Sequence, residues 1–304
     1  MRVNEFRFGL HVVASSGRDE WVRLALQAED VGFSVITVPD HLIDGCLSPF
    51  AALGVAAEAT STLRVGTLVL NNNLRHPTLV AREALTLDSL SGGRFELGVG
   101  AGSTMSSAEH GSIGMPFDDA ATRVARLAES AVILDRLLRG DQVTFEGEHY
   151  RLSGHRAWPP AVQLPRPPML IGGSGRHVLK IGAELADTVG LSGPQARPLA
   201  PEATDERVGF IRSASAGRSI EFQARVQQVI LTDEPRNTAE RLRDSFPELG
   251  ADDIQGSPHL WIGTVDSICE DLLAARERWG MSYFTVFQFS LEAVAPIVTR
   301  LAGT

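Results

Sequence analysis

The sequence is poor in the residues that mark metal-binding, disulfide-bonded and nucleic-acid-binding proteins. Its only two cysteines, Cys46 and Cys269, are far apart and form no C-x-x-C pair, which argues against a zinc site or a disulfide framework. Its 28 basic side chains include a single lysine, Lys180, and none of them cluster into a block. With a formal net charge of −9, we expect no nucleic-acid partner, and the cysteine spacing leads us to expect no bound metal.

Long apolar runs are also missing from the sequence. No segment reaches the roughly 18 apolar residues that a membrane-spanning helix needs. The first residues, MRVNEFRFGLHVV, lack the apolar region that follows the basic residue of a signal peptide. We therefore expect a cytoplasmic protein without a membrane anchor. The 43% hydrophobic content of the 304 residues is enough for a sizeable core.

Strand-like and helix-like patterns alternate along the chain. Strands are expected at residues 8–13, 34–38, 64–70, 95–99, 169–171, 188–191, 225–231 and 283–289. The segments between them place apolar residues at helical spacing, and several end at glycine. Eight such units predict an α/β fold, a (β/α)8 TIM barrel that forms a single domain over residues 1–304. An open doubly wound sheet would normally have fewer strands and a nucleotide fingerprint near its start.

Three segments interrupt the regular alternation. The stretch QVTFEGEHYRL at residues 142–152 contains two short runs around Glu146-Gly147, which predict a β-hairpin insertion. The proline-rich residues 158–168 and residues 194–201 form loops long enough to cover the mouth of a barrel. We expect both loops to act as lids.

The second predicted strand leads directly into an acid and an imidazole, in VITVPDHL. Ligands of such barrels bind at the carboxyl ends of the strands, so Asp40 and His41 are candidate site residues. A histidine there can exchange a proton near neutral pH, and a carboxylate can fix its tautomer or contact a ligand. The alternative interpretation is an aspartate that caps a helix beside a surface histidine.

Polar and glycine-rich segments follow three further strands. Three consecutive asparagines beginning at Asn71 offer amide donors and acceptors, or form a simple turn. The fourth strand ends in Gly100, Ala101, Gly102 and Ser103, where small side chains let the backbone approach a ligand. The fifth ends in Gly172, Gly173, Ser174, Gly175 and Arg176. This last loop opens a helix beside a cation, a suitable phosphate-binding arrangement.

These motifs together resemble the luciferase-like monooxygenase superfamily, and within it the branch that uses the deazaflavin coenzyme F420. The resemblance covers almost the whole chain. It is carried by four stretches, VPDH, GTLVLNNNLRHP, LDSLSGGRFELGVGAG and LIGGSGRHVLKIGAELAD. FMN-using relatives share the barrel, but the GVGAG exit and the compact length are more similar to the F420 branch.

The resemblance implies a role for each motif. A bulge in the third strand, often with a cis peptide bond, would place Leu68 and Val69 behind the central ring of the cofactor. Asn71 would face the ring system and residues 100–103 would line its edge. Residues 173–176 would hold the ribityl phosphate.

The resemblance also implies roles for the Asp-His pair, and the sequence departs from the family at two positions. His41 matches the histidine that acts as acid or base beside the hydride-transferring ring, and Asp40 matches its cofactor-contacting neighbour. Related glucose-6-phosphate dehydrogenases carry a glutamate at the position of Ser103 and an aromatic residue at that of Asp44. These departures and the shortage of lysine argue against sugar-phosphate oxidation.

The function that follows is F420-dependent hydride transfer to or from a small organic substrate, with His41 as proton donor or acceptor. The missing glutamate favours reduction of a C=C, C=N or C=O group over alcohol oxidation. The alternatives are an FMN-dependent two-component monooxygenase and a noncatalytic flavin-binding barrel. The resemblance further implies a homodimer, and a reductase is expected to supply the reduced F420 or flavin.

Overall fold

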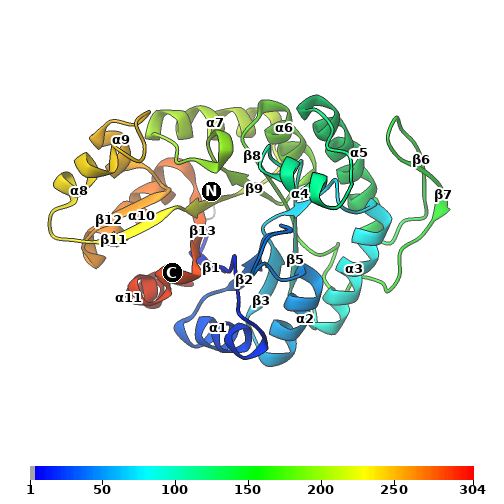
Figure 1. Cartoon of the computed structure of the whole chain (residues 1–304), viewed down its shortest axis with the longest axis horizontal. Helices are drawn as coiled ribbons and strands as arrows, with labels where there is room; N and C mark the ends of the chain where they lie inside the picture. Colours follow the sequence, from blue (N-terminus) through cyan, green and yellow to red (C-terminus); the bar gives the residue numbers. More distant parts are fainter. Residues whose placement is uncertain (1–3) are drawn as a thin grey trace.

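The computed structural model describes residues 4–304 and shows a ring of parallel strands enclosed by helices (Figure 1). Eight strand positions form the barrel, and pairing of β3 with β5 closes the ring. The barrel strands are β1 (Arg7–His11), β2 (Val35–Val38), β3 (Arg64–Thr67) continued by β4 (Leu70–Asn71), β5 (Phe95–Gly100), β8 (Met169–Gly173), β9 (Thr188–Leu191), β10 (Glu221–Val226) and β13 (Met281–Phe287). The structure confirms the predicted TIM barrel.

Helices form the outer layer of the barrel. The longer ones are α1 (Arg18–Val31), α2 (Pro49–Ala59), α3 (Pro77–Leu90), α5 (Ala120–Leu138), α6 (Arg176–Leu185), α7 (Pro201–Ala214), α10 (Val265–Trp279) and α11 (Leu291–Leu301). Short helical segments are α4 (Ser106–Ser112), α8 (Pro235–Leu242), α9 (Ala251–Gly256), η1 (Pro194–Ala196) and η2 (Gln288–Ser290). Capping residues in the sequence determine where several of these helices begin and end. Thr264 caps α10 by accepting a hydrogen bond from Ser267 N at 3.2 Å, and Gly280 ends it at φ 70°.

Two small sheets flank the barrel. The predicted hairpin is confirmed as antiparallel β6 (Val143–Glu146) and β7 (Arg151–His155), which project from one side of the molecule (Figure 1). On the opposite side, β11 (Gln228–Leu231) and β12 (Leu260–Gly263) form a parallel pair beside α8 and α9. This second unit has its own small apolar core of Ala239, Leu249, Ala251, Ile254, Leu260 and Ile262. The sequence analysis did not predict it.

The prediction for the seventh strand is wrong. We expected it at residues 225–231, but the barrel strand is β10, which ends at Val226, and the later residues form β11 in the separate sheet. Gln227 lies at the junction, where its backbone N–H donates to His259 O at 2.7 Å and its side chain donates to Ala196 O at 2.9 Å. Two strands separated by one residue read as a single strand-like segment, RVQQVIL, so the sequence pattern could not separate them.

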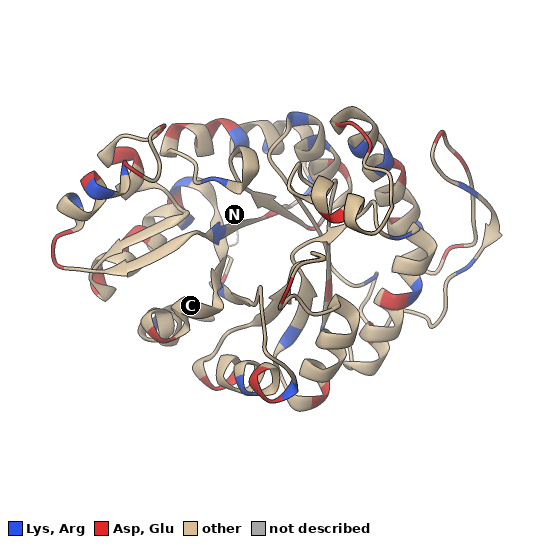
Figure 2. Ribbon diagram, viewed as in Figure 1, with Lys and Arg blue, Asp and Glu red and all other residues tan. Residues whose placement is uncertain are grey.

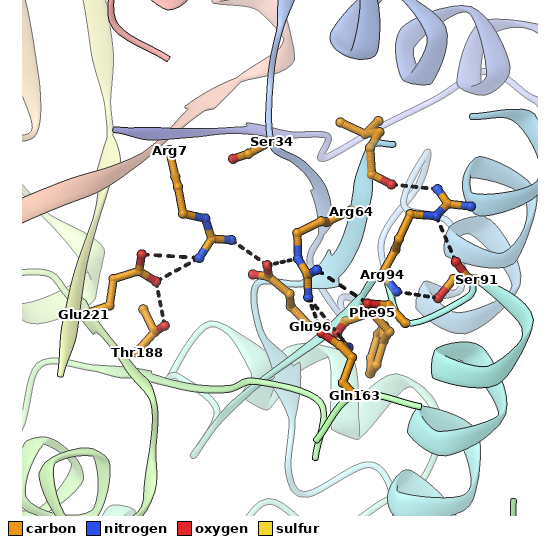
Figure 3. A network of polar contacts seen from close by, with 12 residues as sticks. Arg7, Ser34, Arg64, Ser91, Arg94, Phe95, Glu96, Gln163, Thr188 and Glu221 are labelled. Atoms are coloured by element: carbon orange, nitrogen blue, oxygen red, sulfur yellow. Dashed lines mark hydrogen bonds and ion pairs between the residues drawn. The ribbon is translucent and has the colours of Figure 1, made fainter. Parts of the chain in front are cut away.

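A network of charged side chains fills the amino end of the barrel (Figure 3). Arg7 on β1 binds Glu96 of β5 at 2.5 Å and Glu221 of β10 at 3.0 Å, and Arg64 of β3 also pairs with Glu96. The Arg7 guanidinium lies 4.5 Å from the ring centre of Tyr283. Burial raises the pKa of Glu221, although the nearby guanidinium of Arg7 opposes this. The network joins four strands and closes this end of the barrel to a ligand.

One of the two predicted lids lies at the wrong end of the barrel to act as a lid. The loop at residues 158–168 precedes β8, and its Gln163 side chain binds Arg64 at 2.6 Å and Phe95 O at 2.7 Å beside the charged network (Figure 3). Asp88 of α3 accepts hydrogen bonds from the backbone N–H groups of Val162 and Gln163 at 2.7 and 3.2 Å. The loop is therefore fixed below the amino end, whereas residues 194–201 do follow the carboxyl end of β9.

The surface shows no concentration of one charge. Basic and acidic residues are interspersed over the outer helices (Figure 2). Across residues 4–304, each helix is too short or too polar to cross a membrane. Cys46 and Cys269 are both free thiols.

Candidate active site at the carboxyl end of the barrel

Glycines hollow the inner face of the barrel on the side formed by β5 and β8. A Cβ atom on Gly100 would lie 2.8 Å from Val69 Cγ2, and one on Gly172 would lie 3.2 Å from Val69 Cγ1. A Cβ on Gly98 would lie 2.0 Å from the carbonyl oxygen of Thr67. Any larger residue at Gly98 or Gly100 would displace the neighbouring chain. The side chain of Val69 fills this hollow and remains half-exposed at the mouth.

Val69 reaches this position because the third barrel strand is interrupted. β3 ends at Thr67 and β4 begins at Leu70, and the Leu68–Val69 peptide bond between them is cis. The resemblance implied both the bulge and the cis bond at this place, and the structure confirms them. Leu68 packs inside the barrel with Val35, Leu170 and Tyr283. The result is an apolar wall below the carboxyl ends of β5 and β8.

The three asparagines after this wall form a compact hydrogen-bonded turn. Asn71 Oδ1 accepts from Asn73 N at 3.1 Å and from Asn73 Nδ2 at 2.9 Å. Asn73 Nδ2 also donates to Ala101 O at 2.9 Å, which joins the turn to the exit of β5. Asn71 Nδ2 is buried and has no partner among residues 4–304. A buried amide donor without an acceptor costs free energy, so it is a candidate contact for a bound ligand.

Asp40 is buried beneath this turn and does not contact His41. Its Oδ2 accepts from Asn71 N at 3.1 Å and from Arg75 Nη1 at 2.5 Å. The carboxylate is therefore occupied by two donors from the loop after β4. Its observed contacts fix the position of Asn71 relative to β2.

His41 pairs with a carboxylate that the sequence analysis missed. Its Nδ1 lies 2.9 Å from Glu109 Oε1, and the other oxygen of Glu109 accepts from Leu42 N at 2.7 Å. The Glu109 side chain is 9% exposed, whereas that of His41 is 34% exposed. Glu109 lies on α4, which follows β5, so a carboxylate shortly after a strand exit was the available signal. Glu109 lies six residues after Ser103, the position at which related glucose-6-phosphate dehydrogenases carry a glutamate.

The loop after β8 carries two arginines beside its glycines. Arg176 opens α6 and is exposed, with its guanidinium 4.2 Å from the ring centre of Phe210. Arg207 of α7 donates to Ser174 O at 2.6 Å. Burial lowers the pKa of Arg207. Backbone N–H groups at the start of a ten-residue helix, together with two guanidinium groups, suit a phosphate.

The opposite side of the mouth is polar and formed by β1, β2, β10 and β13. His11 is buried, with Nδ1 3.0 Å from Thr37 Oγ1, and burial holds the pKa of its imidazole well below its usual range. The Phe287 ring lies between His11, at 5.5 Å, and the guanidinium of Arg225, at 5.4 Å. His11 therefore lies inside the barrel.

The structure joins some of the predicted site residues by direct contacts. Asn71 is linked to Ala101 through Asn73, and Gly100 and Gly172 leave room for Val69, whereas His41 pairs with Glu109. Ser103 and Arg176 are exposed at the edge. Outside the site, His76 caps α3 by accepting from Thr78 N at 3.3 Å, as expected for a residue that shapes that turn.

The chain matches one protein family and several curated proteins. The model of the family described as luciferase-like monooxygenase matches residues 4–282. An F420-dependent glucose-6-phosphate dehydrogenase of Nakamurella multipartita is 34% identical over 190 residues, which are 60% of this chain and 54% of that protein. The one of Beutenbergia cavernae is 34% identical over 168 residues, 53% of this chain and 48% of that protein. The matches span about half the length of these curated relatives.

Solved structures share the fold at low sequence identity. An F420-dependent tetrahydromethanopterin reductase from Methanopyrus kandleri superposes with a TM-score of 0.76 at 19% identity, covering 98% of this chain and 100% of that one. An F420-dependent secondary alcohol dehydrogenase, solved with an F420–acetone adduct, gives 0.76 at 17% identity and covers 97% and 98%. The long-chain alkane monooxygenase LadA gives 0.77 at 15% identity and covers 98% and 91%. These similarities confirm the fold.

Proposed function

Because the chain belongs to the luciferase-like monooxygenase family, we propose that it is an oxidoreductase that uses coenzyme F420 and a small organic substrate. The observation that carries the proposal is the His41–Glu109 pair, held at 2.9 Å at the carboxyl end of the barrel. It places a proton-exchanging group at the same end of the barrel as the wall formed by Val69 over its supporting glycines. The similarity to F420-dependent dehydrogenases supports the choice of cofactor.

The residues of the mouth fit a deazaflavin with a phosphate-bearing chain. The half-exposed Val69, which packs over Gly100 and Gly172, provides an apolar wall, and the unpartnered Asn71 Nδ2 offers a donor to a ring oxygen or nitrogen. The loop at residues 172–176, with Arg207, would hold the phosphate. When bound, F420 supplies or accepts a hydride at its deazaflavin carbon.

The proposed roles of the polar residues follow from their contacts. His41 exchanges the proton that accompanies hydride transfer, through Nε2, because Nδ1 faces Glu109. Glu109 orients the imidazole and the loop after β2 with its two oxygens. Asp40 positions Asn71 through its backbone N–H, with Arg75 as its counter-ion.

We place the reaction in the direction of reduction. Ser103 stands where related glucose-6-phosphate dehydrogenases carry a glutamate, so this position has no acid. The carboxylate that reaches the site, Glu109, already binds His41 and the backbone N–H of Leu42. His41 is then the available proton donor at the mouth, which suits protonation of a substrate that receives a hydride. An FMN-dependent monooxygenase remains the second candidate, because the fold of LadA is equally similar.

The first experiment compares the two cofactors directly. Purified protein is titrated with F420 and with FMN while the fluorescence of its four tryptophans is followed. We expect F420 to bind at least about tenfold more tightly, a difference of about 1.4 kcal/mol. Tighter binding of FMN, followed by oxygen consumption with a flavin reductase, would contradict the proposal.

A substrate screen then tests the direction of the reaction. Reduced F420 is mixed with cinnamate, 2-cyclohexenone or acetone, and oxidised F420 with 2-propanol or glucose 6-phosphate. We expect oxidation of reduced F420 by an unsaturated acceptor. Reduction of F420 by glucose 6-phosphate alone would show that the protein is a dehydrogenase of the type found among its curated relatives.

A further inference from the structure

Arg225 is a largely buried arginine without a counter-ion. It lies on β10 in register with Thr285 of β13, two residues after Gln223, whose side chain donates to Thr285 Oγ1 at 2.8 Å inside the barrel. Alternation along the strand therefore points Arg225 to the inner face as well. Its Nε is buried without a hydrogen-bond partner, and no carboxylate of residues 4–304 forms an ion pair with it.

The groups around Arg225 are basic or aromatic. His259 Nδ1 lies 3.0 Å from the carbonyl oxygen of Arg225, and burial lowers the pKa of His259 to about 4. The charges of Arg225 and Arg207 lower it further, and the charge of Arg225 also lowers the pKa of His11. The close contact of the guanidinium is the Phe287 ring, at 5.4 Å. The two acids placed at the mouth, Glu109 and Asp40, are occupied by His41 and Arg75.

Three other buried arginines show what this position lacks. Arg123 also has an unpartnered Nε and no ion pair, but its Nη1 donates to Asp118 O at 2.6 Å, whereas the Arg225 side chain forms no hydrogen bond within residues 4–304. The Arg166 side chain is 2% exposed and pairs with Asp135 at 2.7 Å and Asp187 at 2.5 Å. Arg7 pairs with Glu96 and Glu221. A buried cation without such a partner costs several kcal/mol of desolvation, which a cation–π contact offsets only in part. A residue that destabilises the free protein in this way is expected where a bound ligand supplies the missing counter-ion.

We infer that Arg225 binds the carboxylate of an organic acid that is the substrate of this enzyme, a conclusion that rests on the proposed function. Arg225 lies across Phe287 from His11 on β10, between β9 and β13, whereas the phosphate of F420 is assigned to the loop after β8, two strands away in the barrel. A bidentate guanidinium–carboxylate contact satisfies both the charge and the free N–H groups.

The rim of the same mouth indicates an apolar body for this acid. Exposed apolar side chains occur in the loops that follow β2, β5 and β13: Leu42, Ile43, Met105, Ile113 and Phe289. The contact of Glu109 with His41 and Leu42 joins α4 to the loop after β2, so the first four of these lie in neighbouring segments. An acid with an apolar chain or ring fits this mouth better than a sugar phosphate does.

The test uses cinnamate and its uncharged analogue cinnamamide, with calorimetry and thermal unfolding. Both probes are titrated into the full-length protein without cofactor and again with F420 bound. The variants are Arg225→Met, which removes the charge, Arg225→Lys, which keeps it, and Arg23→Met on the exposed face of α1 as a control for net charge. Arg176→Met reports anion binding at the loop after β8.

We expect wild type to prefer cinnamate over cinnamamide by about 10- to 100-fold, the range for a charge-assisted contact. Arg225→Met should lose this preference, Arg225→Lys should keep part of it, and Arg23→Met and Arg176→Met should keep all of it. The unliganded Arg225→Met protein should unfold at the same temperature as wild type or higher, because an uncompensated charge has been removed.

The following results would overturn the inference. They are a wild type that binds both probes equally, an Arg225→Met protein that still prefers cinnamate, and an unliganded Arg225→Met protein that is clearly less stable than wild type. Loss of the preference only in Arg176→Met would assign the anion to the cofactor loop and overturn it as well. Since the first titration contains no cofactor, its outcome is independent of whether F420 or FMN binds.

Discussion

Replacing Gly100 by alanine tests the wall on which the proposed cofactor ring would rest. The new Cβ would lie 2.8 Å from Val69 Cγ2 and 3.2 Å from Gly172 O, so the branched side chain of Val69 must move toward the mouth. Overpacking of this kind costs about 1–3 kcal/mol. Gly100 does not have positive φ, so the backbone accepts alanine and the cost comes from the contact. We expect a loss of about 2 kcal/mol and weaker F420 binding.

A double-mutant cycle isolates this contact. Stability is measured by urea unfolding for wild type, Gly100→Ala, Val69→Ala and the double variant, and F420 affinity by fluorescence titration. In the Val69→Ala background the two methyl groups are gone, so Gly100→Ala should cost less than half as much. Gly54→Ala is the matched control, since a Cβ there meets nothing within 4 Å in the middle of α2. It should gain about 0.5–1 kcal/mol.

Additivity would refute the reasoning. If Gly100→Ala costs the same with and without the Val69 methyl groups, the two residues do not share the space that the structure assigns to them. If it costs stability as expected but leaves F420 affinity unchanged, the wall exists but does not support the cofactor. The two readouts therefore separate the packing of the barrel from its use as a binding site.

His41→Ala should lower turnover about 100-fold with the acceptor found in the screen while F420 affinity stays unchanged. Glu109→Gln should lower kcat more than it raises KM; an unchanged kcat would remove Glu109 from its orienting role. Burial keeps His259 neutral in the folded protein, with a pKa of about 4 against 6.5 when unfolded. The protein should therefore lose roughly 3 kcal/mol of its free energy of unfolding as the pH falls through 6.5 toward 4. Urea unfolding across this range should show a shallower loss for His259→Asn, and equal slopes would contradict the assignment.

The regular part of the fold could be predicted because its signals are local. Strand β9 (Thr188–Leu191) has the predicted bounds, and helix α10 (Val265–Trp279) ends at Gly280, as expected of a helical segment closed by glycine. The boundary between β10 and β11 could not be predicted, because strand partners far along the chain determine where one strand ends and the next begins. The same holds for the loop at residues 158–168, whose position depends on Asp88 and Arg64.

The candidate site was predicted where a motif lies directly at a strand end. Asp40, His41 and Asn71 all lie at the mouth, but which carboxylate faces the imidazole depends on the fold of the chain beyond β5. There Glu109 reaches His41 over 68 residues of sequence, whereas Asp40, its neighbour in sequence, pairs with Arg75. The unpaired state of Arg225 could not be read from the sequence either, because it is a property of all the strands around it.

The charged network that joins Arg7, Arg64, Glu96 and Glu221 closes the amino end of the barrel, so ligands must enter and leave at the carboxyl end. Two ligands that use the same opening cannot exchange independently when one lies deeper than the other. We therefore expect the cofactor and the organic acid to bind and leave in a fixed order, which steady-state kinetics should show as a compulsory-order pattern.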